Sequence, residues 1–187
     1  MDSPKNLPVA RGSSVLRLLS VLVVVGAAAF AAGAQGAQSS SAAARALLER
    51  FVGAWRTETV IRDASGAEIA HTYGMAAGMP TLGGRWIEFR AASTPPGEAD
   101  LQILTWDAGA RLYRQWLFDA DGSWHAAVGT FDPARETLIW RGDKDGASFV
   151  IEDRWLSPER MTWTLTRTAG DGRVLATVEG TLVRADR

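Results

Sequence analysis

The sequence predicts an all-β protein, a closed antiparallel up-and-down barrel of about 8–10 strands with a short N-terminal helix. Three observations predict this fold. From Ala54 onward, apolar and polar residues alternate with period two, turn residues interrupt the alternation, and all eight tryptophans follow residue 50. Short, regularly spaced strands joined by tight turns are typical of a β-sandwich or a barrel. Tryptophan suits the pleated, apolar face of such a sheet.

The first 34 residues have the pattern of a secretory signal peptide. An apolar stretch, Leu18–Phe30, is too short for the roughly 20 residues of a membrane-spanning helix. It is followed by Ala32-Gly33-Ala34, a small-residue cleavage site. We predict cleavage after Ala34, with Ala37 as the alternative site, then export to the periplasm or secretion without a stable membrane span. An uncleaved N-terminal anchor is the other interpretation. The positive charges before the apolar stretch are Lys5, Arg11 and Arg17.

The remaining chain has the size of one domain. Removing residues 1–34 of the 187 takes away three of the 20 basic and one of the 21 acidic residues, which leaves a net charge of −3. We expect a flexible segment over residues 35–41 and a single barrel domain over residues 42–187. The absence of a basic excess argues against a nucleic-acid partner. The absence of cysteine excludes a disulfide framework and thiol chemistry. Nothing in the composition selects an oligomeric state.

A short helix is expected over Ala42–Val52, directly before the first strand. Its apolar residues recur with helical spacing, Ser40 or Ser41 can cap its start, and Gly53 ends it. The apolar stripe consists of Ala44, Leu47, Leu48 and Phe51.

Ten strands are expected after this helix. Asp-Gly pairs at residues 121–122, 145–146 and 171–172 supply the positive φ angles of tight hairpin turns. Consecutive hairpins leave exposed sheet edges unless the sheet closes on itself, which favours a barrel. A sandwich of two sheets is the alternative. The expected strands lie near residues 54–62, 67–76, 85–93, 101–106, 111–118, 123–131, 137–142, 147–156, 160–168 and 173–184.

The segment Phe51-x-Gly53-x-Trp55, after a short helix and at the start of the first strand, resembles the Gly-x-Trp signature of lipocalin-like (calycin) barrels. In that family the tryptophan packs across the closed end of the barrel, beneath an arginine from the last strands. The resemblance offers Arg167 and Arg184 for this role and does not choose between them.

Three further segments resemble a bacterial family of exported lipocalin-like domains of unknown function: Leu82-Gly-Gly-Arg-Trp86, Trp106-Asp107 and Phe131-Asp-Pro133. The resemblance covers about residues 45–184. It implies the barrel fold and no particular activity. The chain lacks the Thr-Asp-Tyr motif and the disulfide of true lipocalins. It also lacks the C-terminal histidine of the haem-binding ten-stranded barrels, because no histidine follows His125.

Alternation predicts which side chains face the interior. An aromatic wall with a few convergent polar groups suits a small-molecule cavity, and a one-residue error in register would reverse each assignment. The expected inward residues are Trp55, Thr57, Thr59, His71, Tyr73, Met75, Trp86, Glu88, Arg90, Leu112, Arg114, Trp116, Phe118, Ser123, His125, Ala127, Met161, Trp163 and Leu165. From these, the predicted ligand-binding residues are His71, Tyr73, Glu88, Arg114, Trp116 and His125.

The sequence predicts no catalytic residue, metal site or cofactor. Two acidic runs, at Asp119–Gly122 and Asp143–Gly146, begin like calcium loops. They have Thr130 and Arg154 where the bidentate glutamate would stand, so both are interpreted as turns. The predicted function is an exported barrel that binds a small hydrophobic or aromatic molecule. The alternatives are a filled barrel acting as a cell-envelope structural or protein-interaction module, and an enzyme using a His/Glu pair inside the barrel.

Overall fold

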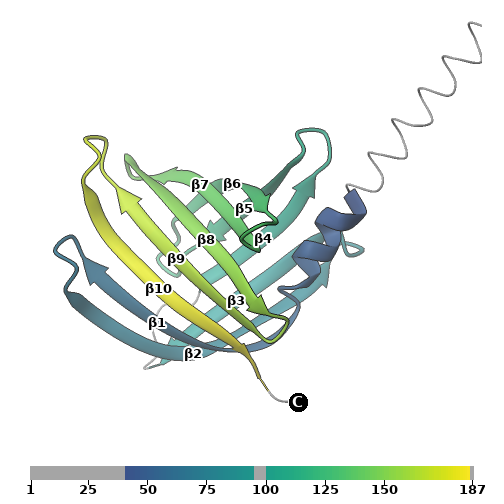
Figure 1. The fold of residues 1–187 in the computed structure, drawn as a ribbon, viewed down its shortest axis with the longest axis horizontal. Helices are drawn as coiled ribbons and strands as arrows, with labels where there is room; N and C mark the ends of the chain where they lie inside the picture. Colours follow the sequence, from purple (N-terminus) through teal and green to yellow (C-terminus); the bar gives the residue numbers. More distant parts are fainter. Residues whose placement is uncertain (1–40, 95–99, 186–187) are drawn as a thin grey trace, which may run out of the picture. The chain divides into compact units, whose positions relative to one another are not determined.

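The computed structural model describes residues 41–94 and 100–185. A helix over residues 41–49 precedes ten strands, which confirms the all-β prediction (Figure 1). The predicted signal peptide, its cleavage sites and residues 35–40 lie outside the described residues. No helix in the described part of the chain is long and apolar enough to span a membrane. The strands are β1 (Gly53–Asp63), β2 (Glu68–Thr81), β3 (Trp86–Thr94), β4 (Asp100–Asp107), β5 (Leu112–Phe118), β6 (Trp124–Asp132), β7 (Thr137–Lys144), β8 (Ala147–Ser157), β9 (Arg160–Thr168) and β10 (Val174–Arg184).

The sheet closes into a barrel, as the sequence predicts. Each strand pairs antiparallel with the next one, and β1 pairs with β10 from Trp55 opposite Arg184 to Asp63 opposite Ala176. Closure leaves no open sheet edge. The expected turn chemistry is present, because Gly122 and Gly172 have φ angles of +87° and +86°.

The inward face is predicted correctly for β1, β6 and β9. Trp55 is 1% exposed and Met161 is 3% exposed. On β6, Ala127 is buried, and its inward neighbour His125 keeps only 9% of its side-chain surface exposed.

The inward face is wrong for β2, β3 and β5. Directly paired residues share a face, so Ala76 points inward opposite Trp55, and Phe89 points inward opposite Gly78. The sequence analysis placed large aromatic and polar side chains inside, whereas the interior of β2 takes small residues. A side chain at Gly78 would collide with the backbone oxygen of Phe51. The residues expected inside that instead face outward are His71, Tyr73, Met75, Trp86, Glu88, Arg90, Leu112, Arg114, Trp116 and Phe118.

The helix covers one end of the barrel, which we call the closed end (Figure 1). Its apolar face joins the buried core of the barrel. The Phe51 ring packs edge-on against Phe89 and Trp155, at centroid distances of 6.0 Å and 5.1 Å. The buried core at this end includes Leu47, Leu48, Phe51, Trp55, Phe89, Leu104, Leu138, Trp140, Trp155, Met161 and Leu182.

Arg184 is the arginine that packs on Trp55, with its guanidinium carbon 4.0 Å from the ring centroid. The same guanidinium donates hydrogen bonds to the carbonyl oxygens of Val52 and Arg50. Gly53 makes room for this guanidinium, because a Cβ there would collide with Nη1 of Arg184. Its φ of +123° independently favours glycine. The Gly-x-Trp motif therefore builds the closed end of the barrel.

Candidate functional site

The other end of the barrel, which we call the open end, is not covered by the helix (Figure 1). It is formed by the end of β1, the start of β2 and the strand ends that lie beside them. Inward-facing residues here, among them Thr59, Leu165 and Val178, are only half-buried. Inward residues at the closed end, such as Trp55 and Trp140, are 1% and 0% exposed. These interior side chains are therefore more exposed than those at the closed end.

A chain of amide and carboxyl groups lines the interior on β4 and β5. Gln115 is 2% exposed and donates from Nε2 to Oε1 of Gln102 at 2.8 Å. Gln102 in turn points its Nε2 at Oδ1 of Asp100, 3.4 Å away. Burial raises the pKa of Asp100 to about 6, the Gln102 contact opposes the rise, and the charge of Asp119 adds to it.

A second polar group continues this wall in the β5–β6 turn and at the end of β7. Asp119 accepts hydrogen bonds from Nζ of Lys144 at 2.6 Å and from the Ser123 hydroxyl at 3.0 Å. Burial raises the pKa of Asp119, but these two hydrogen bonds outweigh it and the net shift is downward. Asp119 is therefore a paired anion at neutral pH.

His125 lies beside this pair on the inner face of β6. Its ring packs edge-on against Phe149, with the centroids 5.0 Å apart. Nδ1 lies 3.6 Å from Oδ2 of Asp119, too far for a hydrogen bond. Burial lowers the pKa of His125 and Asp119 only partly offsets this, so the imidazole is neutral at pH 7.

Three polar atoms on this inner surface are buried and have no hydrogen-bond partner: Oε1 of Gln115, Nδ1 of His125 and Nε of Arg167. Gln115 and Arg167 lie in one continuous row of paired residues that crosses five strands, β5 to β9. Leaving one buried polar atom unpaired costs about 1–3 kcal/mol. These atoms can therefore form hydrogen bonds with a ligand. The row consists of Gln115, Ala127, Gly142, Phe149 and Arg167.

Of the six predicted ligand-binding residues, only His125 lies in this site. Asp100, Gln115 and Arg167 were missed. Arg167 could have been found by continuing the correct inward alternation of β9, Met161-Trp163-Leu165, by two residues. Gln115 could have been found only with the correct face for β5.

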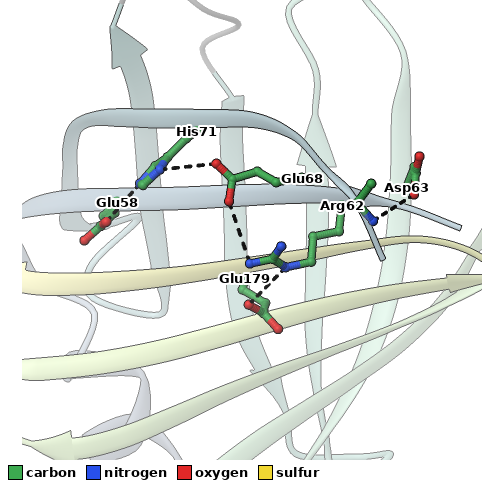
Figure 2. Close-up of polar contacts among 7 residues, drawn as sticks. Glu58, Arg62, Asp63, Glu68, His71 and Glu179 are labelled. Atoms are coloured by element: carbon green, nitrogen blue, oxygen red, sulfur yellow. Dashed lines mark hydrogen bonds and ion pairs between the residues drawn. The ribbon is translucent and has the colours of Figure 1, made fainter. Parts of the chain in front are cut away.

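His71 and Tyr73 lie on the outer face of β2. Figure 2 shows His71 between two glutamates, with Nε2 2.9 Å from Glu58 and Nδ1 3.6 Å from Glu68. Arg62 extends the cluster from Glu68 to Glu179 on β10, at 3.8 Å from each. The Tyr73 ring stacks on His71 at 5.0 Å. These are contacts of a solvated surface.

Glu88, Arg114 and Trp116 also face outward. Glu88 pairs with Arg90 at 2.6 Å and Arg114 with Asp107 at 2.8 Å. Glu88 and His125 do not face each other inside the barrel, because the two residues lie on opposite faces of the sheet. Among the described residues, no group of three or more histidine, aspartate or glutamate side chains could hold a metal ion.

Arg114 and Trp116 do line two grooves, but on the outer surface. One, of about 480 Å³, lies over β5–β7 and includes Trp124; Gln115, His125 and Lys144 also contribute to its lining. The other, of about 450 Å³, lies between the helix and β3–β5 and includes Trp86. The Trp86 and Trp116 rings pack at 5.6 Å.

Comparisons with known proteins identify the fold and no family. No family model matches the chain, and no curated protein matches it. Rv2717c from M. tuberculosis is 11% identical, with a TM-score of 0.57 over 74% of this chain and 95% of that one. The S-type phycobiliprotein lyase CPES from Guillardia theta is 13% identical, with a TM-score of 0.54 over 75% and 91% of the two chains. These similarities concern the fold alone.

Proposed function

We propose that this protein binds a small molecule in the interior of its barrel, through the open end. The observation that carries the proposal is the set of three buried polar atoms without partners, on Gln115, His125 and Arg167. Their cost to the folded state is offset when a ligand supplies the missing hydrogen bonds. That one of the similar barrels is a phycobiliprotein lyase supports the proposal.

The ligand has a hydrophobic or aromatic part. The row that joins Gln115 to Arg167 includes Phe149. The half-buried Leu165 and Val178 are directly paired on β9 and β10. The Trp163 ring lies over Gly180, where a Cβ would collide with it. These side chains give the ligand an apolar surface opposite the polar wall of β4–β7.

We propose that the protein acts outside the cytoplasm, in the periplasm or in secreted form. This rests on the signal-peptide pattern of residues 1–34 and on the size of the chain that remains after cleavage.

The test is native mass spectrometry of the protein as its host makes it, with tryptophan emission recorded before and after mild delipidation. We expect a co-purifying molecule whose removal shifts the emission. In a Trp163→Phe variant this shift is expected to shrink, because Trp163 faces the interior. The matched variant Trp124→Phe removes an outward tryptophan, 63% exposed, and should keep the shift. A clean apo mass with unmoved emission contradicts the proposal.

A second candidate function, a protein-interaction module, is favoured by one observation. Phe118 and Trp124 are directly paired on the outer face and are 40% and 63% exposed, beside Val128 at 43%. Clusters of exposed apolar side chains are typical of interaction sites. Trp124→Ser would then abolish partner binding and leave the interior unchanged. A His/Glu enzyme has no such support, because Glu88 and His125 lie on opposite faces.

A further inference from the structure

Arg167 carries a charge that the described part of the chain leaves unneutralised. Its Nε is buried without a hydrogen-bond partner, and no carboxylate of residues 41–94 and 100–185 forms an ion pair with it. A partly buried guanidinium is costly unless an anion pairs with it.

The acids on the inner surface are already engaged. Asp119 is held by Lys144 and Ser123, and Asp100 lies on β4 beside Gln102. At the closed end, Asp153 accepts a hydrogen bond from Nε1 of Trp140 at 2.7 Å. None of these three carboxylates pairs with Arg167, so a bound ligand can supply the matching anion.

A second donor lies near Arg167. Phe149 is paired with Arg167 across β8 and β9, and the His125 ring packs edge-on against the same Phe149. The charge of Arg167 also acts on His125. Nδ1 of His125 has no partner, and in the tautomer that protonates it, this atom donates a hydrogen bond. Arg167 and His125 are therefore both neighbours of Phe149 on the inner face of the barrel.

We propose that the ligand is an organic carboxylate, with its carboxylate bound by Arg167 and His125 and its apolar body resting on Phe149, Leu165 and Val178. This inference rests on the proposed function and specifies its ligand class. The planar guanidinium matches a carboxylate through two parallel hydrogen bonds. A phosphate group is a poorer match, because Lys144, a second cation at the open end, is already paired with Asp119 at 2.6 Å.

The test compares two probes with the same apolar body, 1-naphthaleneacetate and 2-(1-naphthyl)ethanol, by calorimetric titration of the delipidated protein. We expect the acid to bind about tenfold tighter than the alcohol. Arg167→Met should abolish this preference and leave the alcohol affinity unchanged. The matched control is Arg154→Met, which removes an exposed arginine on β8 and should keep the preference.

A second variant keeps the test decisive if Arg167→Met fails to fold by circular dichroism. His125→Phe preserves an aromatic ring against Phe149 and removes Nδ1, so acid binding should weaken about threefold or more while alcohol binding holds. Equal affinities of the two probes, or a preference that survives both variants, overturn the carboxylate inference and leave the interior-binding function standing. Binding of neither probe, together with a clean apo mass, overturns both.

Discussion

The two ends of the barrel use an arginine from the last two strands in opposite ways. At the closed end, Arg184 packs on Trp55 and donates to the backbone oxygens of Val52 and Arg50. At the open end, Arg167 has a buried Nε that donates to nothing. The guanidinium at the closed end is therefore paired within the chain, whereas Nε of the arginine at the open end has no partner among the described residues. Stability and the proposed binding are therefore separated along the barrel axis.

The largest loss of stability is expected when Gly53 is replaced. Gly53→Ala places a Cβ against Arg184 and forces a φ of +123° on alanine, so we expect a loss of about 3 kcal/mol or more in the free energy of unfolding. Urea denaturation measures this loss. The matched control is Gly66→Ala in the β1–β2 turn, where φ is +84° but a Cβ meets nothing. That control should cost only about 1 kcal/mol. Equal losses in the two variants would show that Arg184 does not stabilise the closed end.

The next effect concerns Asp153, a buried acid at the closed end. Burial raises its pKa to about 7, against the opposing hydrogen bond from Trp140. Because the folded state favours the protonated form, its contribution is complete below pH 4 and is lost as pH rises to 7. We expect the free energy of unfolding to fall on the order of 3 kcal/mol across this range.

In the Asp153→Asn variant, the free energy of unfolding should fall less between pH 4 and pH 7. The amide oxygen still accepts the hydrogen bond from Trp140, and the amide cannot ionise. Denaturant midpoints measured from pH 4 to 8 provide the comparison. Asp100→Asn, at the open end, should reduce the fall less, since the pKa of Asp100 is raised only to about 6. An unchanged pH profile in Asp153→Asn would place the ionising group elsewhere.

A smaller change in stability, together with a loss of ligand affinity, is expected when Gln115 is replaced. Gln115→Leu removes a buried oxygen that has no partner and also the Nε2 donor to Gln102, so the ligand-free protein should lose only about 1–2 kcal/mol. Ligand binding should nevertheless weaken. Calorimetric titration and thermal unfolding on the same sample test both halves. A large loss of stability without a change in binding would mean that Gln115 belongs to the structural core.

The fold was predictable because its signals are local. Alternation, the Asp-Gly turns and the Gly53-x-Trp55 motif each act within a few residues, and the structure has the expected ten strands. The inward face of β2 was not predictable in this way. His71, Tyr73 and Met75 match an aromatic wall, but the backbone of Phe51, just after the helix, approaches Gly78 so closely that only the small-residue face fits inside.

The site was less predictable because it depends on which distant strands pair. Only the closure of β1 on β10 places Arg184 opposite Trp55 and so leaves Arg167 for the open end. The unpaired atoms of Gln115 and Arg167 become a site through a row of residues that crosses five strands. No spacing along the sequence encodes that row.

The smallest effect is expected on the outer face, at His71. His71→Gln breaks contacts with Glu58 and Glu68, whose side chains are 50% and 44% exposed. Exposed ion pairs contribute about 0–1 kcal/mol, so the free energy of unfolding should change by less than about 0.5 kcal/mol. Binding of the carboxylate probe should be unchanged, since His71 points away from the interior. Weaker probe binding in this variant would place the ligand on the outer surface and would end the separation between the two ends of the barrel.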